Sequence, residues 1–251
     1  MSTRPNIRWT HVFVDRPVAD LGAAVAFWTA VTGTTVSEPR GDRGEFVTLL
    51  PAGADAWVKA QGVGEGPGGA HLDLSVEDVP ALVAWALGLG AETVAEHDGW
   101  AVLRSPGGQL FCAVPWQGES ARPPVTGGPG GATSRLDQVC LDVAPDAFAA
   151  ETAFWAALTG WESLAGALPE FHLVRPPAGL PLRILVQRLD TDRPAAAHLD
   201  LACSDVDAVR AHHETLGATA VGRGARWTVM RDPAGGTYCL TGRDPATGSL
   251  P

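Results

Sequence analysis

The stretch AHLDL occurs twice in the chain, at residues 70–74 and again at 197–201. The same offset of 127 residues relates further pairs, namely Phe27 to Phe154, Trp28 to Trp155, Gly33 to Gly160, Trp100 to Trp227 and Cys112 to Cys239. A fixed offset over so much sequence indicates a tandem duplication. We therefore predict one domain at 1–116, a second at 134–243 and a tail at 244–251. Residues 117–133, rich in Pro, Gly and Ser, are expected to be a flexible linker.

Each half contains the same order of elements twice. Residues 9–15 alternate like a strand, a helical apolar spacing runs from Leu21 to Gly33, and strand-like segments follow at 45–50 and 56–61. Next come a strand at 70–76, a helix at 77–90 and a hairpin over 99–114. The second half repeats this order, with Ser204 as the expected N-cap of its last helix. The sequence predicts an α+β fold of four βαβββ modules.

The two faces of a β-strand explain the alternation of apolar and polar residues in AHLDL. Because successive side chains point to opposite faces, Leu72 and Leu74 can pack under a helix while His71 and Asp73 point the other way. A polar face opposite a helix-covered face is typical of a sheet that lines a ligand cavity. We therefore predict that each half has a pocket. Its candidate lining residues are Trp9, His11, Phe13, His71, Asp73, Trp100 and Cys112 in the first half, and Gln138, His198, Asp200, Trp227 and Cys239 in the second.

Composition narrows the class of partner. The formal charge of −10 comes without any basic patch, which argues against nucleic acid and anionic membranes. The sequence has no run of ~18 apolar residues, so we predict no membrane span. The N-terminus also lacks the apolar region of a secretory signal. The four cysteines form no CxxC pair, as expected for reduced thiols. We therefore expect a cytoplasmic protein whose partner is a small molecule.

The order of these features resembles the vicinal oxygen chelate superfamily, and within it the glyoxalase-like, bleomycin-resistance-like branch. The resemblance rests on a strand with histidine, a helix containing FW, a strand with HLDL, and a turn SPGG or DPAG before a strand containing FC or YC. It implies that modules pair into two cupped, incomplete barrels. Some members are glyoxalases, dioxygenases or epimerases, and others only bind drugs. The resemblance also implies a monomer in which two halves mimic the family's dimer.

The resemblance implies metal-ligand positions on the first and last strands of each module. The first-strand positions are His11, His71, Gln138 and His198, and the last-strand positions are Gln61, Cys112, Gln187 and Cys239. Cysteine stands where metalloenzymes of the superfamily usually have glutamate. A divalent metal would therefore be zinc rather than iron, and an iron extradiol dioxygenase is not expected.

Two assemblies of these ligands remain open. If each half closes on itself, His11, His71 and Cys112 converge; if the halves exchange partners, His11 and Gln61 meet His198 and Cys239. The candidate metal residues are therefore His11, His71 and His198. The alternative for each is structural, since a strand cysteine is commonly a small buried hydrophobe and a histidine near an aspartate a hydrogen-bonded core pair.

Three functions compete. The favoured one is binding of a small aromatic or hydrophobic metabolite, with catalysis undecided. The alternative is a metal-dependent lyase or isomerase of the glyoxalase type, in which the metal polarises vicinal oxygens of a substrate. A third has His71 or His198 as general base without metal. Direct pairing of His71 with Asp73 is not expected, because residues two apart on a strand are separated by about 6.6 Å.

Overall fold

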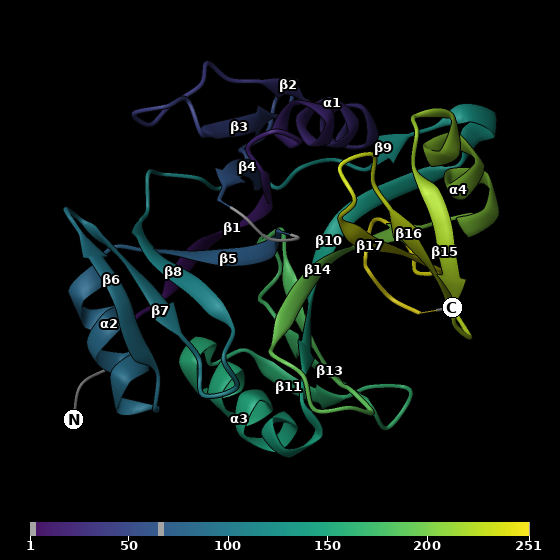
Figure 1. The fold of residues 1–251 in the computed structure, drawn as a ribbon. Coiled ribbons are helices and arrows are strands. Elements are labelled where there is room, and N and C mark those ends of the chain that lie inside the picture. The colour runs from purple at the N-terminus through teal and green to yellow at the C-terminus, as the bar shows by residue number, and fades with distance from the viewer. Residues whose placement is uncertain (1–3, 65–67, 251) are drawn as a thin grey trace. The chain divides into compact units, whose positions relative to one another are not determined.

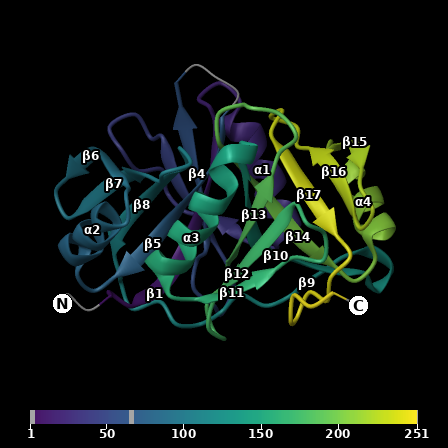
Figure 2. The same ribbon diagram turned by 90° about the horizontal axis from the view of Figure 1, so that it is seen from below.

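The computed structural model describes residues 4–64 and 68–250 (Figures 1 and 2). Residues 1–3 and 65–67 of the predicted first domain, and residue 251 of the predicted tail, lie outside the described residues. The element order confirms four βαβββ modules, with one additional short strand between the second and third. No helix in the described part of the chain is long and apolar enough to cross a membrane.

The first two modules form an eight-stranded sheet of strand order β2-β3-β4-β1-β5-β8-β7-β6. The first module comprises β1 (Ile7–Pro17), α1 (Leu21–Thr32), β2 (Thr35–Val36), β3 (Phe46–Leu50) and β4 (Val58–Val63). The second comprises β5 (Gly69–Val76), α2 (Val79–Gly88), β6 (Glu92–His97), β7 (Trp100–Arg104) and β8 (Leu110–Pro115). Within the second module, α2 packs on β6, β7 and β8.

The last two modules form the second sheet, of order β11-β12-β13-β10-β14-β17-β16-β15. The third module comprises β10 (Thr133–Val143), α3 (Phe148–Thr159), β11 (Glu162–Ala165), β12 (Phe171–Arg175) and β13 (Arg183–Arg188). The fourth comprises β14 (Ala196–Cys203), α4 (Val206–Thr215), β15 (Thr219–Arg223), β16 (Trp227–Arg231) and β17 (Thr237–Thr241). Helix α4 packs on β15, β16 and β17, as Figure 2 shows.

The short strand β9 (Thr126–Gly127) lies in the segment expected to be a flexible linker. It pairs antiparallel with the start of β10, in the register Thr133 with Gly127. The Thr126 hydroxyl donates to the Thr32 carbonyl at 3.1 Å, and the backbone N–H of Ala121 donates to the Asp55 carboxylate at 2.7 Å. Much of this segment is therefore held by hydrogen bonds, in contrast to what its composition suggests.

The chain forms two compact units that do not coincide with its two halves. Unit 1 comprises Met1–Val12, His71–Ser120 and Val139–Ala197, and unit 2 comprises Phe13–Ala70, Ala121–Gln138 and His198–Pro251. Unit 1 thus holds most of the second and third modules, and unit 2 most of the first and fourth. The boundaries at 116, 133 and 243 stay a prediction from the repeat.

The helix ends follow the expected chemistry, with one correction. Gly33 and Gly160 adopt the left-handed conformation just after α1 and α3, at φ of 63° and 64°. Asp78 caps α2 by accepting from the backbone N–H of Ala81. The prediction of Ser204 as the cap of α4 was wrong, because the next residue, Asp205, takes this position and accepts from the N–H of Ala208.

The core of unit 1 contains a buried carboxylate. Phe111 of β8 packs against Phe154 and Trp155 of α3, with ring centroids 5.9 and 5.1 Å away. Glu151, one turn earlier on α3, accepts from Ser105 Oγ at 2.6 Å, from Trp155 Nε1 at 2.7 Å and from the backbone N–H of Gly107 at 2.8 Å. Burial raises the pKa of Glu151, and these three donors oppose that shift.

The core of unit 2 places its carboxylate on the turn instead of the helix. Asp232 Oδ2 accepts from Arg16 Nη2 at 2.7 Å and from Trp28 Nε1 at 3.1 Å, while Asp232 Oδ1 accepts from the N–H groups of Ala234 and Gly236. Arg16 and Asp232 are each 3% exposed, so the ion pair lies inside the core. One aspartate therefore closes the turn and anchors α1 and β1.

His213 of α4 is also buried in unit 2, at 1% exposure, and its Nδ1 lies 3.0 Å from the Tyr238 hydroxyl. Burial lowers its pKa from the ordinary 6.5 to about 4, and the charge of His212 adds to this. Below pH ~6.5 His213 binds a proton in the unfolded chain but not in the folded protein. The free energy of unfolding therefore decreases as the pH is lowered, until the pKa of His213 in the folded protein is reached.

We expect the protein to lose about 3 kcal/mol of stability from this residue between pH 7 and pH 4. Thermal unfolding at several pH values measures the loss. The variant His213→Gln keeps a polar partner for Tyr238 without titrating in this range, and its unfolding temperature should depend less steeply on pH. An identical pH dependence in both proteins would contradict the assignment.

Candidate functional site

The polar face of β5 and β8 brings three metal-ligand types together in unit 1. The two strands are parallel, with Asp73 opposite Cys112 in the register, so their side chains share one face of the sheet. His71 lies two residues before Asp73 and shares that face. One ligand atom from each of His71, Asp73 and Cys112 lies within 4.8 Å of the other two. All three residues come from the second module, so their grouping does not decide between the two assemblies left open by the sequence.

The apolar face of the same strands explains why these groups are held in place. Leu72 and Leu74 of β5, and Phe111 and Ala113 of β8, are at most 2% exposed and form the core. Their packing fixes the strands, and strand alternation then fixes the direction of the polar side chains between them. Asp73 and Cys112 are themselves only 3% and 5% exposed. The side chain of His71 is 15% exposed, so the cluster opens to solvent at His71.

The spacing argument against a direct contact between His71 and Asp73 was wrong. His71 Nε2 lies 3.7 Å from Asp73 Oδ1, and the equivalent His198 Nε2 lies 3.4 Å from Asp200 Oδ1. The backbone positions are separated as expected, but the imidazole is long enough to lean along the strand toward the carboxylate. Each aspartate can therefore orient the histidine that precedes it by two residues.

His11 occupies the next position along this polar face. Its Nδ1 lies 3.4 Å from Ser75 Oγ, and its Nε2 lies 3.6 Å from Glu119 Oε1. Both side chains of the His11 and Glu119 pair are largely buried, at 5% and 15% exposure. Glu119 Oε2 also accepts from the backbone N–H of Gln117, which holds the carboxylate toward the sheet. Glu119 thus supplies unit 1 with a carboxylate near this face, whereas the closing strand β8 has Cys112 where the resemblance leads us to expect glutamate.

The donor set of the cluster in unit 1 fits a zinc-type ion. Imidazole nitrogen, carboxylate oxygen and thiolate sulfur are its usual ligands, and three protein ligands leave one position open for a small molecule. The set also departs from the two-histidine, one-carboxylate pattern of non-haem iron enzymes. We call His71, Asp73 and Cys112 the candidate metal centre, and His11 with Glu119 the adjacent acid–base pair.

The second half repeats the register with different partners. Asp200 of β14 lies opposite Cys239 of β17, as Asp73 does opposite Cys112. Gln138 takes the place of His11, and its Nε2 donates to Asp200 Oδ2. The Asp200 carboxylate therefore has an amide donor in addition to His198, all within unit 2. The weaker metal site expected in the second half stays a prediction.

The remaining predicted pocket residues differ in how much surface they offer. Trp9 is 1% exposed and therefore serves mainly the core. Trp100 is half-buried and stacks on His97 with centroids 3.9 Å apart. Trp227, also half-buried, lies opposite Thr241. Phe13 is 8% exposed and packs edge-on against Phe46.

The two glutamines proposed for last-strand positions lie on strands as expected. Gln61 of β4 lies opposite Phe46 in unit 2. Gln187 of β13 accepts from the thiol of Cys140 at 3.6 Å in unit 1. The structure thus groups His71 with Cys112, places His11 beside them with Glu119, and puts His198 with Asp200 in the other unit.

Both halves of the chain match the same protein family. A family model described as a glyoxalase-like domain matches residues 11–114 and again residues 138–241. No curated protein matches the sequence.

Solved structures agree in fold at low identity. An extradiol ring-cleaving dioxygenase from B. fuscum superposes with a TM-score of 0.66 at 13% identity, over 100% of this chain and 77% of that one. A mutant of 4-hydroxymandelate synthase from Streptomyces coelicolor gives 0.58 at 15%, over 98% and 95%. A xylose isomerase-like TIM barrel/4-hydroxyphenylpyruvate dioxygenase fusion protein gives 0.56 at 12%, and the match covers 95% of this chain but only 49% of the fusion. At such identities the likeness establishes the fold and no activity.

Proposed function

Because the chain belongs to the glyoxalase-like family of the vicinal oxygen chelate superfamily, we propose that it binds a small oxygen-bearing metabolite through a divalent metal of the zinc class. His71, Asp73 and Cys112 would hold the metal. The observation that carries the proposal is the convergence of one nitrogen, one oxygen and one sulfur ligand within 4.8 Å of one another on a largely buried sheet face.

The residues around the metal centre would bind and orient the ligand. A bound metal would supply Lewis-acid polarisation of a carbonyl or of two vicinal oxygens. His11 would exchange a proton at Nε2, where Glu119 stabilises the protonated ring, while Ser75 fixes the ring through Nδ1. Trp100 is half-buried on β7 and lies on the same sheet face as Cys112, because Val102, two residues further on, pairs with Cys112. Its ring would present an aromatic surface to an apolar part of the ligand. This arrangement supports a lyase or isomerase.

A second candidate, a metal-free binding protein, is favoured by one specific observation. The titratable groups of this face already lie within ion-pair distance of one another, His71 with Asp73 at 3.7 Å and His11 with Glu119 at 3.6 Å, so each carboxylate faces an imidazole without an ion. Such a protein would bind its metabolite equally well in a chelator. For either candidate we propose a cytoplasmic protein. We also propose that it is a monomer, since its two domains in one chain would replace the two subunits of a dimer.

Elemental analysis of protein purified without chelator and reconstituted with zinc separates the two candidates. We expect about one zinc per chain in the unaltered protein and its loss in His71→Ala, because three ligands are the fewest that hold catalytic zinc. His172→Ala is the matched control, since His172 lies on β12 with its Nε2 2.8 Å from Ser163 Oγ. His11→Ala should retain the metal, because His11 is not among the ligands.

Two results would contradict the proposal. Absence of zinc from the reconstituted protein would leave the metal-free binder, to be studied by tryptophan fluorescence against candidate metabolites. Retention of zinc in His71→Ala would mean that the ligands have been wrongly assigned.

A further inference from the structure

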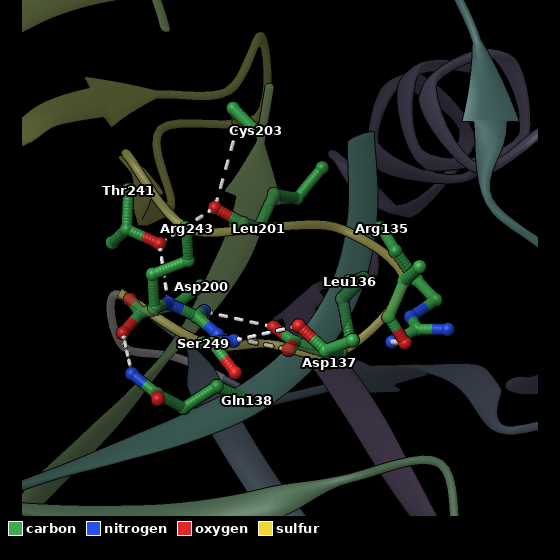
Figure 3. A network of polar contacts seen from close by, with 12 residues as sticks. Arg135, Leu136, Asp137, Gln138, Asp200, Leu201, Cys203, Thr241, Arg243 and Ser249 are labelled. Carbon is green, nitrogen blue, oxygen red and sulfur yellow. Dashed lines mark hydrogen bonds and ion pairs between the residues drawn. The ribbon is translucent and has the colours of Figure 1, made fainter. Parts of the chain in front are cut away.

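Unit 2 contains a cluster of three arginines around one aspartate, on β10 and the segments beside it. Arg243 follows β17 and forms two bonds with Asp137 of β10, from Nη1 to Oδ2 and from Nη2 to Oδ1, each 2.8 Å long. Arg135 lies two residues before Asp137 on the same strand, and Arg122 comes from the segment 117–133. Figure 3 shows the Asp137 and Arg243 pair, with Arg135 beside it on β10.

Two of these arginines have a buried Nε–H without an acceptor among the described residues. Arg135 is only 6% exposed, and its Nη2 donates to the Ala246 carbonyl at 2.8 Å. Its Nε is buried and has no hydrogen-bond partner among the described residues, and the same holds for Nε of Arg122. A buried N–H of a charged group is costly unless an acceptor satisfies it. Two such donors in one cluster therefore indicate a missing acceptor.

The equivalent arginine of the first half has different partners from Arg135. Arg8, its equivalent at the offset of 127, donates to Glu77 at 2.6 Å and stacks over the ring of Trp116 at 4.1 Å. The corresponding partners in the second half are Ser204 and Arg243. The carboxylate is thus replaced by a hydroxyl and the aromatic ring by another cation, while the arginine itself is kept.

The charges of the cluster do not balance. Asp137 is engaged by both ends of the Arg243 guanidinium, and Asp244, which is exposed, accepts from the N–H groups of Ala246 and Thr247. Burial lowers the pKa of Arg135 to about 10, and the positive charges of Arg122 and Arg243 act in the same direction. Three cations thus face two carboxylates, and neither carboxylate accepts a hydrogen bond from the Nε of Arg135 or Arg122.

We propose that Arg122 and Arg135 bind a small oxyanion, a phosphate or carboxylate group, whose oxygens accept from the two free Nε–H groups. Guanidinium N–H donors match such planar or tetrahedral oxyanions well and form short, charge-assisted bonds with them. This anion site belongs to unit 2 and uses none of the residues of the candidate metal centre. It can therefore be tested whether or not a metal is bound.

Thermal unfolding in inorganic phosphate, in acetate and in chloride at one ionic strength tests the proposal. A ligand that binds only the folded protein raises its unfolding temperature progressively with concentration. We expect phosphate or acetate to raise the unfolding temperature above the value in chloride, and Arg135→Gln to lose that difference. The larger of the two effects identifies whether the site prefers a phosphate or a carboxylate. Arg8→Gln, the matched control from the first half, should keep the difference.

Arg122→Gln provides a second variant in case Arg135→Gln does not fold. Arg122 is only partly buried, so its substitution disturbs the core less, and it should also reduce the anion-dependent shift. Equal unfolding temperatures of the unaltered protein in all three salts would overturn the proposal. So would an undiminished shift in both the Arg122 and Arg135 variants, since the anion would then bind elsewhere.

Discussion

Replacing Asp232 by alanine is expected to destabilise the protein by about 3–5 kcal/mol, the usual cost of removing one partner from a buried ion pair. Arg16 would remain buried with its charge uncompensated, and Trp28 would lose the acceptor of its indole N–H. The turn N–H groups of Ala234 and Gly236 would lose theirs as well. The effect should therefore be among the largest of any single substitution in unit 2.

Chemical or thermal unfolding measures this loss, with a fall of about 2–4 °C in Tm per kcal/mol for a chain of this size. Glu77→Ala is the matched control, because it breaks the exposed ion pair with Arg8, in which the Glu77 side chain is 65% exposed. Such surface pairs contribute about 0–1 kcal/mol. Similar losses in the two variants would mean that the Arg16 and Asp232 pair does not stabilise the core as described.

Replacing Cys112 by alanine is expected to weaken zinc binding by more than about 100-fold. Loss of a residue that merely supports a ligand costs about 10–100-fold in affinity, and loss of the ligand itself should cost more. A competition titration against a coloured zinc chelator measures the affinity. The proposed ligand set requires this result, because only two protein ligands would remain.

Cys203→Ala is the control for the thiol. Cys203 is 2% exposed on β14, and burial raises its pKa to about 12, so this thiol stays protonated and is a poor metal ligand. The variant should bind zinc as the unaltered protein does. An unchanged affinity in Cys112→Ala would remove Cys112 from the proposed centre.

Much of the fold and part of the site could be predicted from local patterns. The repeat of 127 residues indicated the modules, and alternation in the AHLDL strand placed His71 and Asp73 on the polar face. The cysteines were placed on closing strands by the same alternation. What alternation could not supply is the parallel register that puts Asp73 opposite Cys112, because a register depends on how distant strands pair.

Other features of the site and the core depend on side-chain contacts that differ between the two halves and that the repeat does not predict. Glu119 lies in a segment whose composition suggests a flexible linker, and only the structure brings its carboxylate to His11. Position 105 is Ser and its equivalent 232 is Asp, so similar turns obtain their carboxylate from the helix residue Glu151 in one unit and from the turn itself in the other. A substitution at one position of a repeat is compensated at another, and sequence alone does not show where.

The absorption spectrum of the cobalt(II)-substituted protein is the sharpest test of the proposed metal centre, because Co²⁺ takes the place of Zn²⁺ and its thiolate bond absorbs in the near ultraviolet. We expect one equivalent of Co²⁺ per chain, with a thiolate-to-cobalt band that disappears in Cys112→Ser and persists in Cys203→Ala. A cobalt complex without that band, or one in which the band survives in Cys112→Ser, would contradict a metal centre built from His71, Asp73 and Cys112.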